Sequence, residues 1–205
     1  MSENVIIDTT ADYIKGSREN LELALTVEEA LPAVKKELRG RFWSALFLRL
    51  EKGLKEAGSD EKWRIEEDPT DTILRGLEKP YAGLQAAMRE DRDKNRVVVG
   101  IWQDRGTLAL YHGVTCTGKK PTTIMPEFEE LRGRIEKTLG RTTPWQVGWE
   151  WTDNIVLNEK CTLVRLASAP EEPAALADQV SKKVLRILED HGECIAAADA
   201  ALARA

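Results

Sequence analysis

The sequence predicts an α+β fold, in which an antiparallel β-meander sheet has long helices packed on one side. Two observations carry this prediction. Residues 81–116 contain short runs rich in β-branched and aromatic residues, divided by turn residues. Before and after them, apolar residues recur every three or four positions over 34–54 and 176–195. Strands grouped together, with helices on either side in the sequence, are typical of an α+β layer sandwich.

The first two helices are predicted in the N-terminal quarter. Residues 9–25 indicate a short helix that Gly16 loosens. Thr26–Glu29 has the form of a capping box, so the long second helix is expected to begin there, with Pro32 in its first turn. It carries an apolar residue at every fourth position, namely Val34, Leu38, Phe42, Leu46, Leu50 and Leu54, and ends at Gly58 and Ser59. We therefore divide the chain into residues 1–25, an N-terminal helical appendage or connector, and residues 26–205, a single α+β domain.

Two more helices are predicted downstream. Residues 127–139 form an amphipathic pattern between Pro126 and Gly140. The final helix is expected to start near Ala174, and the Ala-rich end of the chain is expected to fray. Strands are predicted at 63–67, 82–89, 96–103, 106–116, 145–151 and 161–167, with turns at 68–71, 91–95 and 104–106.

The segment Trp-Gln-Val-Gly-Trp-Glu-Trp at 145–151 holds three of the six tryptophans. Residues two apart share a face of a strand, so Trp145, Val147, Trp149 and Trp151 are expected to form one apolar surface. Such rings either fill a core beneath the helices or grip a partner, and the pattern alone leaves both interpretations open.

The composition of the chain excludes some classes of function. The chain has 205 residues, 42% of them hydrophobic and 32% charged, with a net charge of −5 and a pI near 5.3. This balance argues against a uniformly basic nucleic-acid binder. Apolar runs fall short of the ~20 residues of a membrane helix, and the first residues do not read as a secretory signal. The three cysteines are widely spaced, which suits a reducing compartment, so a cytoplasmic location is expected.

Candidate catalytic and metal motifs lack their usual context. Gly113 to Lys119 has the Gly-x4-Gly-Lys spacing of a phosphate-binding loop, but Lys120 and Pro121 follow in place of a hydroxyl residue and a helix. His112 and His191 are far apart, and no cysteine pair has zinc-knuckle spacing, so no metal or cofactor is predicted. The cysteines are expected to be inert packing residues.

A magnesium-dependent nuclease needs an Asp and an acid-x-Lys triplet on neighbouring strands. The only acid-x-Lys we single out, Asp60-Glu-Lys62, falls in a predicted loop. A divergent nuclease would have to assemble its site from acids near strand ends, of which the candidates are Glu66, Glu67, Asp68, Asp71 and Glu90.

The order of segments resembles a known group of proteins. It runs from the helix with Leu38-Arg-Gly-Arg-Phe-Trp-Ser-Ala-Leu46 through a meander ending in Leu108-Ala-Leu-Tyr-His-Gly113. The helix at 127–139, Thr143-Pro-Trp-Gln-Val-Gly-Trp149 and a long last helix follow, and residues 19–25 and 28–33 are similar to a helical connector. Together they resemble the C-terminal half of a bacterial and phage-associated group in the PD-(D/E)XK nuclease superfamily.

The resemblance implies an accessory module of prokaryotic phage defence. In that group the catalytic carboxylates and lysine lie in the preceding half, so no catalytic residue carries over to this chain. We therefore expect a non-catalytic binding module with a protein partner, such as a nuclease subunit, while nucleic-acid contact and oligomeric state stay open. The expected contact surface consists of exposed rings on the sheet: Trp102, Tyr111, Trp145, Trp149 and Trp151. The alternatives are a divergent nuclease and a small-ligand sensor with its pocket between sheet and helices.

Overall fold

The fold was analysed in a computed structural model, which describes residues 3–68, 72–90, 95–117, 126–143 and 146–204. The helices are α1 (Glu3–Lys15), α2 (Arg18–Glu56), α3 (Pro126–Leu139), α4 (Lys160–Ser168) and α5 (Glu172–Arg204). The strands are β1 (Arg64–Asp68), β2 (Gly83–Ala87), β3 (Arg96–Gln103), β4 (Ala109–Thr117) and β5 (Gln146–Val156).

The five strands form one antiparallel sheet in the order β1-β2-β3-β4-β5, so each strand pairs with its neighbours along the chain. The predicted meander is therefore confirmed. Asp104 closes the β3–β4 hairpin, because its Oδ1 accepts hydrogen bonds from the amides of Thr107 and Ala109. Such side-chain bonds to nearby amides are the usual way in which Asp stabilises a turn.

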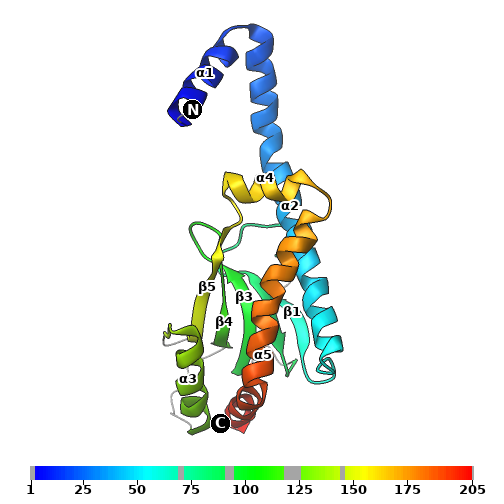
Figure 1. The fold of residues 1–205 in the computed structure, drawn as a ribbon, viewed down its shortest axis with the longest axis vertical. Helices are drawn as coiled ribbons and strands as arrows, with labels where there is room; N and C mark the ends of the chain where they lie inside the picture. The colour runs from blue at the N-terminus through cyan, green and yellow to red at the C-terminus, as the bar shows by residue number, and fades with distance from the viewer. Residues whose placement is uncertain (1–2, 69–71, 91–94, 118–125, 144–145, 205) are drawn as a thin grey trace.

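The helices α2, α3 and α5 cover one face of this sheet (Figure 1). Alternate strand residues such as Leu84, Val99 and Leu110 join the apolar stripes of these helices in the main core. Phe42 and Trp43 of α2 lie at its centre, with no exposed surface. The predicted α+β fold, with long helices on one side of the sheet, is thus confirmed.

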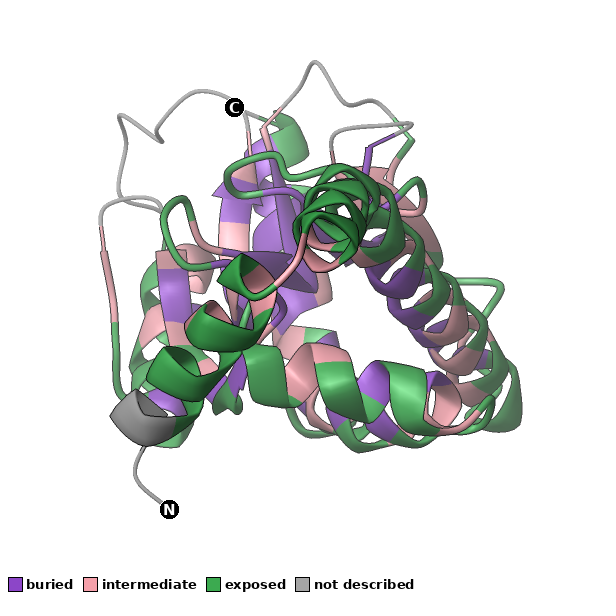
Figure 2. Ribbon diagram, turned by 90° about the horizontal axis from the view of Figure 1, so that it is seen from above, coloured by how far each residue is buried: buried purple, intermediate pink, exposed green. Residues whose placement is uncertain are grey.

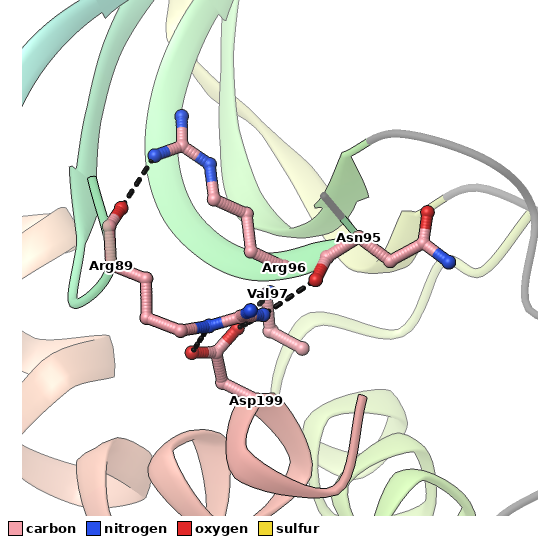
Figure 3. A network of polar contacts seen from close by, with 5 residues as sticks. All are labelled: Arg89, Asn95, Arg96, Val97 and Asp199. Carbon is pink, nitrogen blue, oxygen red and sulfur yellow. Dashed lines mark hydrogen bonds and ion pairs between the residues drawn. The ribbon is translucent and has the colours of Figure 1, made fainter. Parts of the chain in front are cut away.

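The α5 helix is tied to the sheet near its C-terminal end by a polar contact (Figure 3). The buried carboxylate of Asp199 accepts from the side chain of Arg89 and from the backbone amide of Val97. Ala201 and Leu202 beyond it are also buried, and α5 runs to Arg204. The expectation that the Ala-rich end frays is therefore wrong, since these residues pack on the body.

The N-terminal helices extend away from the sheet and the helices that cover it, which together we call the body. The helix α1 and the first turns of α2 stand clear of the sheet (Figure 1), and their residues are almost all exposed (Figure 2). We call residues 6–37 the arm. Where α1 and α2 meet, the partly buried residues include Ala11, Ile14 and Ala24, and apart from Ile14 these are small. Little apolar area is therefore buried within the arm itself.

Two predicted boundaries are wrong. The α2 helix begins at Arg18, where Ser17 is the N-cap and its Oγ accepts from the Asn20 amide. Thr26 lies inside the helix and donates to the carbonyl of Glu22, so the predicted capping box does not start a helix. Pro32 is likewise inside α2. The division of the chain at residues 25 and 26 stays a prediction.

One predicted element has the wrong type. Residues 161–167, expected to be a strand, lie in α4, whose one buried residue is Leu166. The β-branched residues of this segment favoured a strand, but the apolar residues at 163 and 166 have helical spacing. The turns expected at 68–71 and 91–95 fall largely outside the described residues.

Candidate functional site

The second face of the sheet is where polar and aromatic side chains meet. On β3, Val97, Val99 and Ile101 point into the main core, so Arg96, Val98 and Trp102 point the other way. Within the described residues, no helix contributes to the small apolar cluster on this second face. We call it the open face.

An aromatic row crosses the open face on three strands. Trp102 on β3 is paired with Tyr111 on β4, which is paired with Trp151 on β5. The rings of Trp102 and Tyr111 are stacked, with centroids 5.7 Å apart and planes at 28°. Tyr111 meets Trp149 and Trp151 edge to face, at 5.7 and 6.0 Å. Both geometries are favourable for aromatic pairs, so the rings hold one another in place.

Glycines on neighbouring strand positions leave room for these rings. A Cβ on Gly100 would lie 2.9 Å from the Trp102 ring and 2.5 Å from the Leu84 carbonyl oxygen. A Cβ on Gly113 would lie 2.9 Å from the Cβ of Trp149. The absence of side chains at these two positions therefore leaves the space that Trp102 and Trp149 occupy.

The rings are less accessible than the sequence predicted. Trp102 and Tyr111 are only 4% and 7% exposed, so the expectation that they are exposed rings is wrong. Burial raises the pKa of the Tyr111 hydroxyl, so it stays protonated at neutral pH. Trp149 and Trp151 are half-buried, and Trp145 falls outside the described residues. The row is thus a preformed wall whose accessible surface belongs mainly to Trp149 and Trp151.

One residue of the tryptophan segment faces the other way. The pairing of β4 with β5 shifts between Gly148 and Gln146, which inserts Val147 as an extra residue. Val147 joins the main core, whereas Trp149 joins the open-face cluster. The expectation that Val147 shares a surface with the tryptophans is therefore wrong, because the bulge breaks the alternation.

A polar group lies beside the row, towards β1. The carboxylate of Glu66 accepts a hydrogen bond from Gln85 Nε2 at 2.7 Å and pairs with the guanidinium of Arg96. Gln85 and Arg96 are 1% and 3% exposed. Two buried atoms of this group, Gln85 Oε1 and Arg96 Nε, have no hydrogen-bond partner. Because Glu66 can only accept when ionised, it fixes the Gln85 amide with its oxygen unpaired.

A pocket of about 600 Å³ opens on this face. Its walls include Gln85, Arg96, Trp102 and Tyr111. At its edge Tyr81 is 58% exposed and has a φ of 60°, a left-handed conformation that is unusual for an aromatic residue. Strained residues with exposed side chains cluster at functional sites, which singles out this ring.

A smaller cavity of about 260 Å³ lies on the helix side, next to His112 and Lys183. His112 is buried and its Nδ1 is 2.9 Å from the hydroxyl of Thr152. Burial, and the nearby charge of Lys183, lower the pKa of His112 to about 4. This cavity lies between sheet and helices, where a sensor pocket was expected, but the sensor function stays a prediction. The pocket of about 600 Å³ is on the opposite face of the sheet.

The acids proposed for a nuclease are occupied in other contacts. Glu66 binds Arg96, Glu90 pairs with Arg64, and Glu67 Oε2 accepts from the amides of residues 72–74. Asp68 lines the open-face pocket, and Asp71 falls outside the described residues. Among the side chains that the structure describes, no three of His, Cys, Asp or Glu are grouped as a metal site.

The remaining motifs are structural where they are described. Gly113–Thr117 belongs to the interior of β4, so the proposed phosphate loop begins within a strand, while Gly118 and Lys119 fall outside the described residues. Cys116 is buried, and its burial raises the pKa of the thiol to about 11. Cys161 is exposed on α4.

Sequence reasoning missed Gln85, Arg96 and Tyr81 as site residues. A signal was present for Gln85, because it is the one polar residue of β2 and lies in the middle of that strand. Arg96 is the first residue of β3, where a polar residue is ordinary. Comparison with family models, with curated proteins and with solved structures finds no match to this chain. In the described residues, no helix has the length and apolar character needed to cross a bilayer.

Proposed function

We propose that the chain is a non-catalytic binding module whose open sheet face holds a small, planar, uncharged group. The observation that carries the proposal is the pair of unpaired buried atoms, Gln85 Oε1 and Arg96 Nε, in the wall of a pocket bounded by stacked rings. Its volume is in the range of small-molecule sites, about 300–1,000 Å³.

Hydrogen-bond chemistry defines the ligand class. An unpaired buried polar group costs about 1–3 kcal/mol. A ligand that donates to Gln85 Oε1 and accepts from Arg96 Nε would remove this cost at both atoms. Since both atoms are covered in the free chain, neighbouring side chains have to shift to admit the ligand. A planar ring or amide with a donor beside an acceptor, as in a nucleobase, has the required groups.

Charge argues against an anionic ligand. The positive charge of Arg96 is already paired with Glu66, and Asp68 lies in the pocket wall. The whole chain carries a net charge of −5. Among the described residues that line the pocket, Arg96 is the only cation. A phosphate placed there would therefore meet carboxylates whose charge is not offset, so nucleosides are expected to bind better than nucleotides.

Within the part of the chain that the structure describes, the side chains around the pocket are suited to binding. The acids near the open face are engaged by Arg96, Arg64 or backbone amides, as described above. Neither Cys116 nor His112 belongs to the walls of the large pocket. The groups that line it can position a ligand, but none is poised as a nucleophile with an adjacent base.

The variant Tyr81→Asn tests this function. Asn tolerates a positive φ, so the substitution removes the exposed ring without straining the backbone. The probes are the four ribonucleosides, their 5′-monophosphates and benzamide, with binding followed by tryptophan fluorescence. We expect at least one uncharged probe to bind the native chain and to bind Tyr81→Asn at least about tenfold more weakly, a loss of ~1.4 kcal/mol.

Tyr13→Asn is the matched control, because Tyr13 is 65% exposed on the arm, outside the pocket. It should bind as the native chain does. Failure of every probe to bind, or equal weakening by both variants, would contradict the proposal.

The family resemblance adds a proposed partner. An accessory module of a PD-(D/E)XK-type defence system would act beside a nuclease chain that carries the Asp and Glu-x-Lys groups. An adjacent reading frame that encodes such a core, and whose product co-purifies with this chain, would support the partnership. A neighbourhood without any such frame would count against it.

A further inference from the structure

The arm exposes an unusual amount of apolar surface. Nine large apolar side chains between Ile6 and Val34 are each 44–65% exposed. On α2, Val27, Leu31 and Val34 continue the stripe that reaches the buried core at Leu38 and Phe42. The apolar face of α2 is thus buried in the main core where the helix lies in the body, and it is exposed to solvent in the arm. Apolar patches of several hundred Å² on one surface mark interaction sites.

Charged residues flank this bare stripe in a self-complementary order. Glu28 and Glu29 precede Leu31, and Lys35 and Lys36 follow it. No ion pair within the described part of the chain engages any of these four side chains. Two antiparallel α2 helices related by a two-fold axis near Leu31 to Val34 would place the acidic pair of each copy level with the basic pair of the other. Glu28 and Lys35 border the stripe and would meet across the contact, whereas Glu29 and Lys36 lie further round the helix.

The same arrangement fills a groove on the body. A groove of about 650 Å³ runs beside α2 where the arm joins the body, lined in part by Gly40, Ser44, Ala45 and Leu48. Leu48 is 63% exposed. With the axis near Leu31 to Val34, residues 21–25 of one copy fall opposite residues 39–43 of the other, at this groove.

We propose that a second copy of this chain docks antiparallel on the arm and forms a two-fold symmetric dimer. The proposal is independent of the open-face pocket. Stable interfaces bury about 800 Å² per partner. The exposed stripe of Val27, Leu31 and Val34, continued by Leu48 at the groove, would supply the apolar part of such an interface. A two-fold interface requires a surface that complements itself, and the arm has both the apolar stripe and the charge order for it.

The charge of the arm favours a second copy of the chain over a lipid surface as its binding partner. Between Asp8 and Glu37 there are seven acidic and four basic residues, a net charge of −3. Interfacial helices that bind anionic membranes are basic on their polar face. An acidic arm is therefore repelled by such a membrane, whereas paired arms place opposite charges together.

Sedimentation equilibrium of the full chain between 1 and 200 µM tests the proposal. The native chain is expected to have twice the 23.0 kDa mass of one copy. The paired substitutions Glu28→Lys and Glu29→Lys should raise the dissociation constant about tenfold, and so should Lys35→Glu with Lys36→Glu. All four substitutions together should restore it to within about threefold of the native value, because the swapped charges again face opposite charges.

Two further variants complete the test. Leu31→Glu with Val34→Glu should weaken association about 100-fold or more, since it places charge in the apolar contact. Glu189→Lys with Glu193→Lys, on exposed positions of α5, makes the same charge change away from the arm and should have no effect. Melting temperatures check that each variant folds.

A native chain of 23.0 kDa at every concentration would overturn the proposal. So would a fourfold charge variant that stays as weak as either pair alone. Flotation of the native chain with vesicles of phosphatidylcholine or phosphatidylserine, without self-association, would assign the stripe to a lipid surface instead.

Discussion

Asp199 and Arg89 form a bidentate ion pair across 110 residues of sequence. The Nε–H and an Nη2–H of Arg89 donate to the two carboxylate oxygens at 2.7 and 2.8 Å, and the Val97 amide donates to Oδ1 at 2.8 Å. Asp199 is 2% exposed, so its charge is compensated almost entirely by this one side chain and one amide (Figure 3). The contact fixes the end of α5 against the edge of the β2–β3 hairpin.

Removing this carboxylate should be costly. In Asp199→Ala the guanidinium and the Val97 amide lose their shared acceptor in a buried place, which typically costs about 3–5 kcal/mol. Urea denaturation should report a loss of that size. Asp190→Ala, which removes only an i,i+4 pair with an exposed Arg186, should cost under about 1 kcal/mol. Equal losses in the two variants would show that the Asp199 contact does not secure α5.

The glycine under the aromatic row should resist substitution. Gly100→Ala places a methyl group 2.5 Å from the Leu84 carbonyl oxygen and 2.9 Å from the Trp102 ring, so we expect a loss of about 1–3 kcal/mol and a changed tryptophan emission. Gly133→Ala is the matched control on α3. Its added methyl group meets nothing within 4 Å, and it should stabilise the chain by about 0.5–1 kcal/mol. A Gly100→Ala chain of native stability would contradict the packing described for the row.

Stability should depend on His112 in mildly acidic solution. Its pKa is about 4 in the folded chain and near 6.5 when unfolded, so between these values only the unfolded state binds the proton. Stability is therefore complete above pH 6.5 and falls as the pH is lowered towards 4, by up to about 3 kcal/mol. In His112→Gln this part of the pH dependence should disappear from urea titrations at pH 7, 6, 5 and 4. A native chain and a His112→Gln chain with parallel curves would exclude the effect.

The cysteines should differ sharply in reactivity. The thiol of Cys116 is buried with its pKa raised to about 11, and burial also raises the pKa of Cys194. Cys161 is exposed. At pH 8 a thiol reagent should modify Cys161 first, as mass spectrometry of peptides can show, and Cys161→Ser should remove the fast phase. Modification of Cys116 at the rate of Cys161 would contradict its placement.

The sheet could be predicted because its signals are local. The strand with Val97, Val99 and Ile101 is a short, almost continuous run of apolar residues, and turn residues such as Asp104 follow its end. The start of α2 could not be predicted in this way. Thr26 and Pro32 have the chemistry of a helix start, but Ser17 already caps the helix, and helix continuity overrides the later signal.

The site was predictable only in part. The tryptophan pattern predicted that Trp149 and Trp151 share one face of a strand, and the structure places both in the aromatic row. The stacking of Trp102 on Tyr111 depends on the register of β3 with β4, which the sequence analysis did not predict. The pairing of Glu66 with Arg96 joins residues 30 apart through the register of three strands, which no local pattern encodes. Neither the unpaired atoms of Gln85 and Arg96 nor the bulge at Val147 has a sequence signal of its own.

We propose that the open face holds a planar, uncharged ligand between Gln85, Arg96 and the aromatic row. A ¹H–¹⁵N NMR titration with the strongest-binding nucleoside or benzamide tests this, by following the Nε–H of Arg96, the side-chain amide of Gln85 and the indole N–H of Trp102. We predict that these three signals shift together and saturate, while the backbone amides of Lys183 and Ile187 in α5, on the helix side, do not move. Saturable shifts confined to the helix side, or no saturable shift at all, would contradict the account.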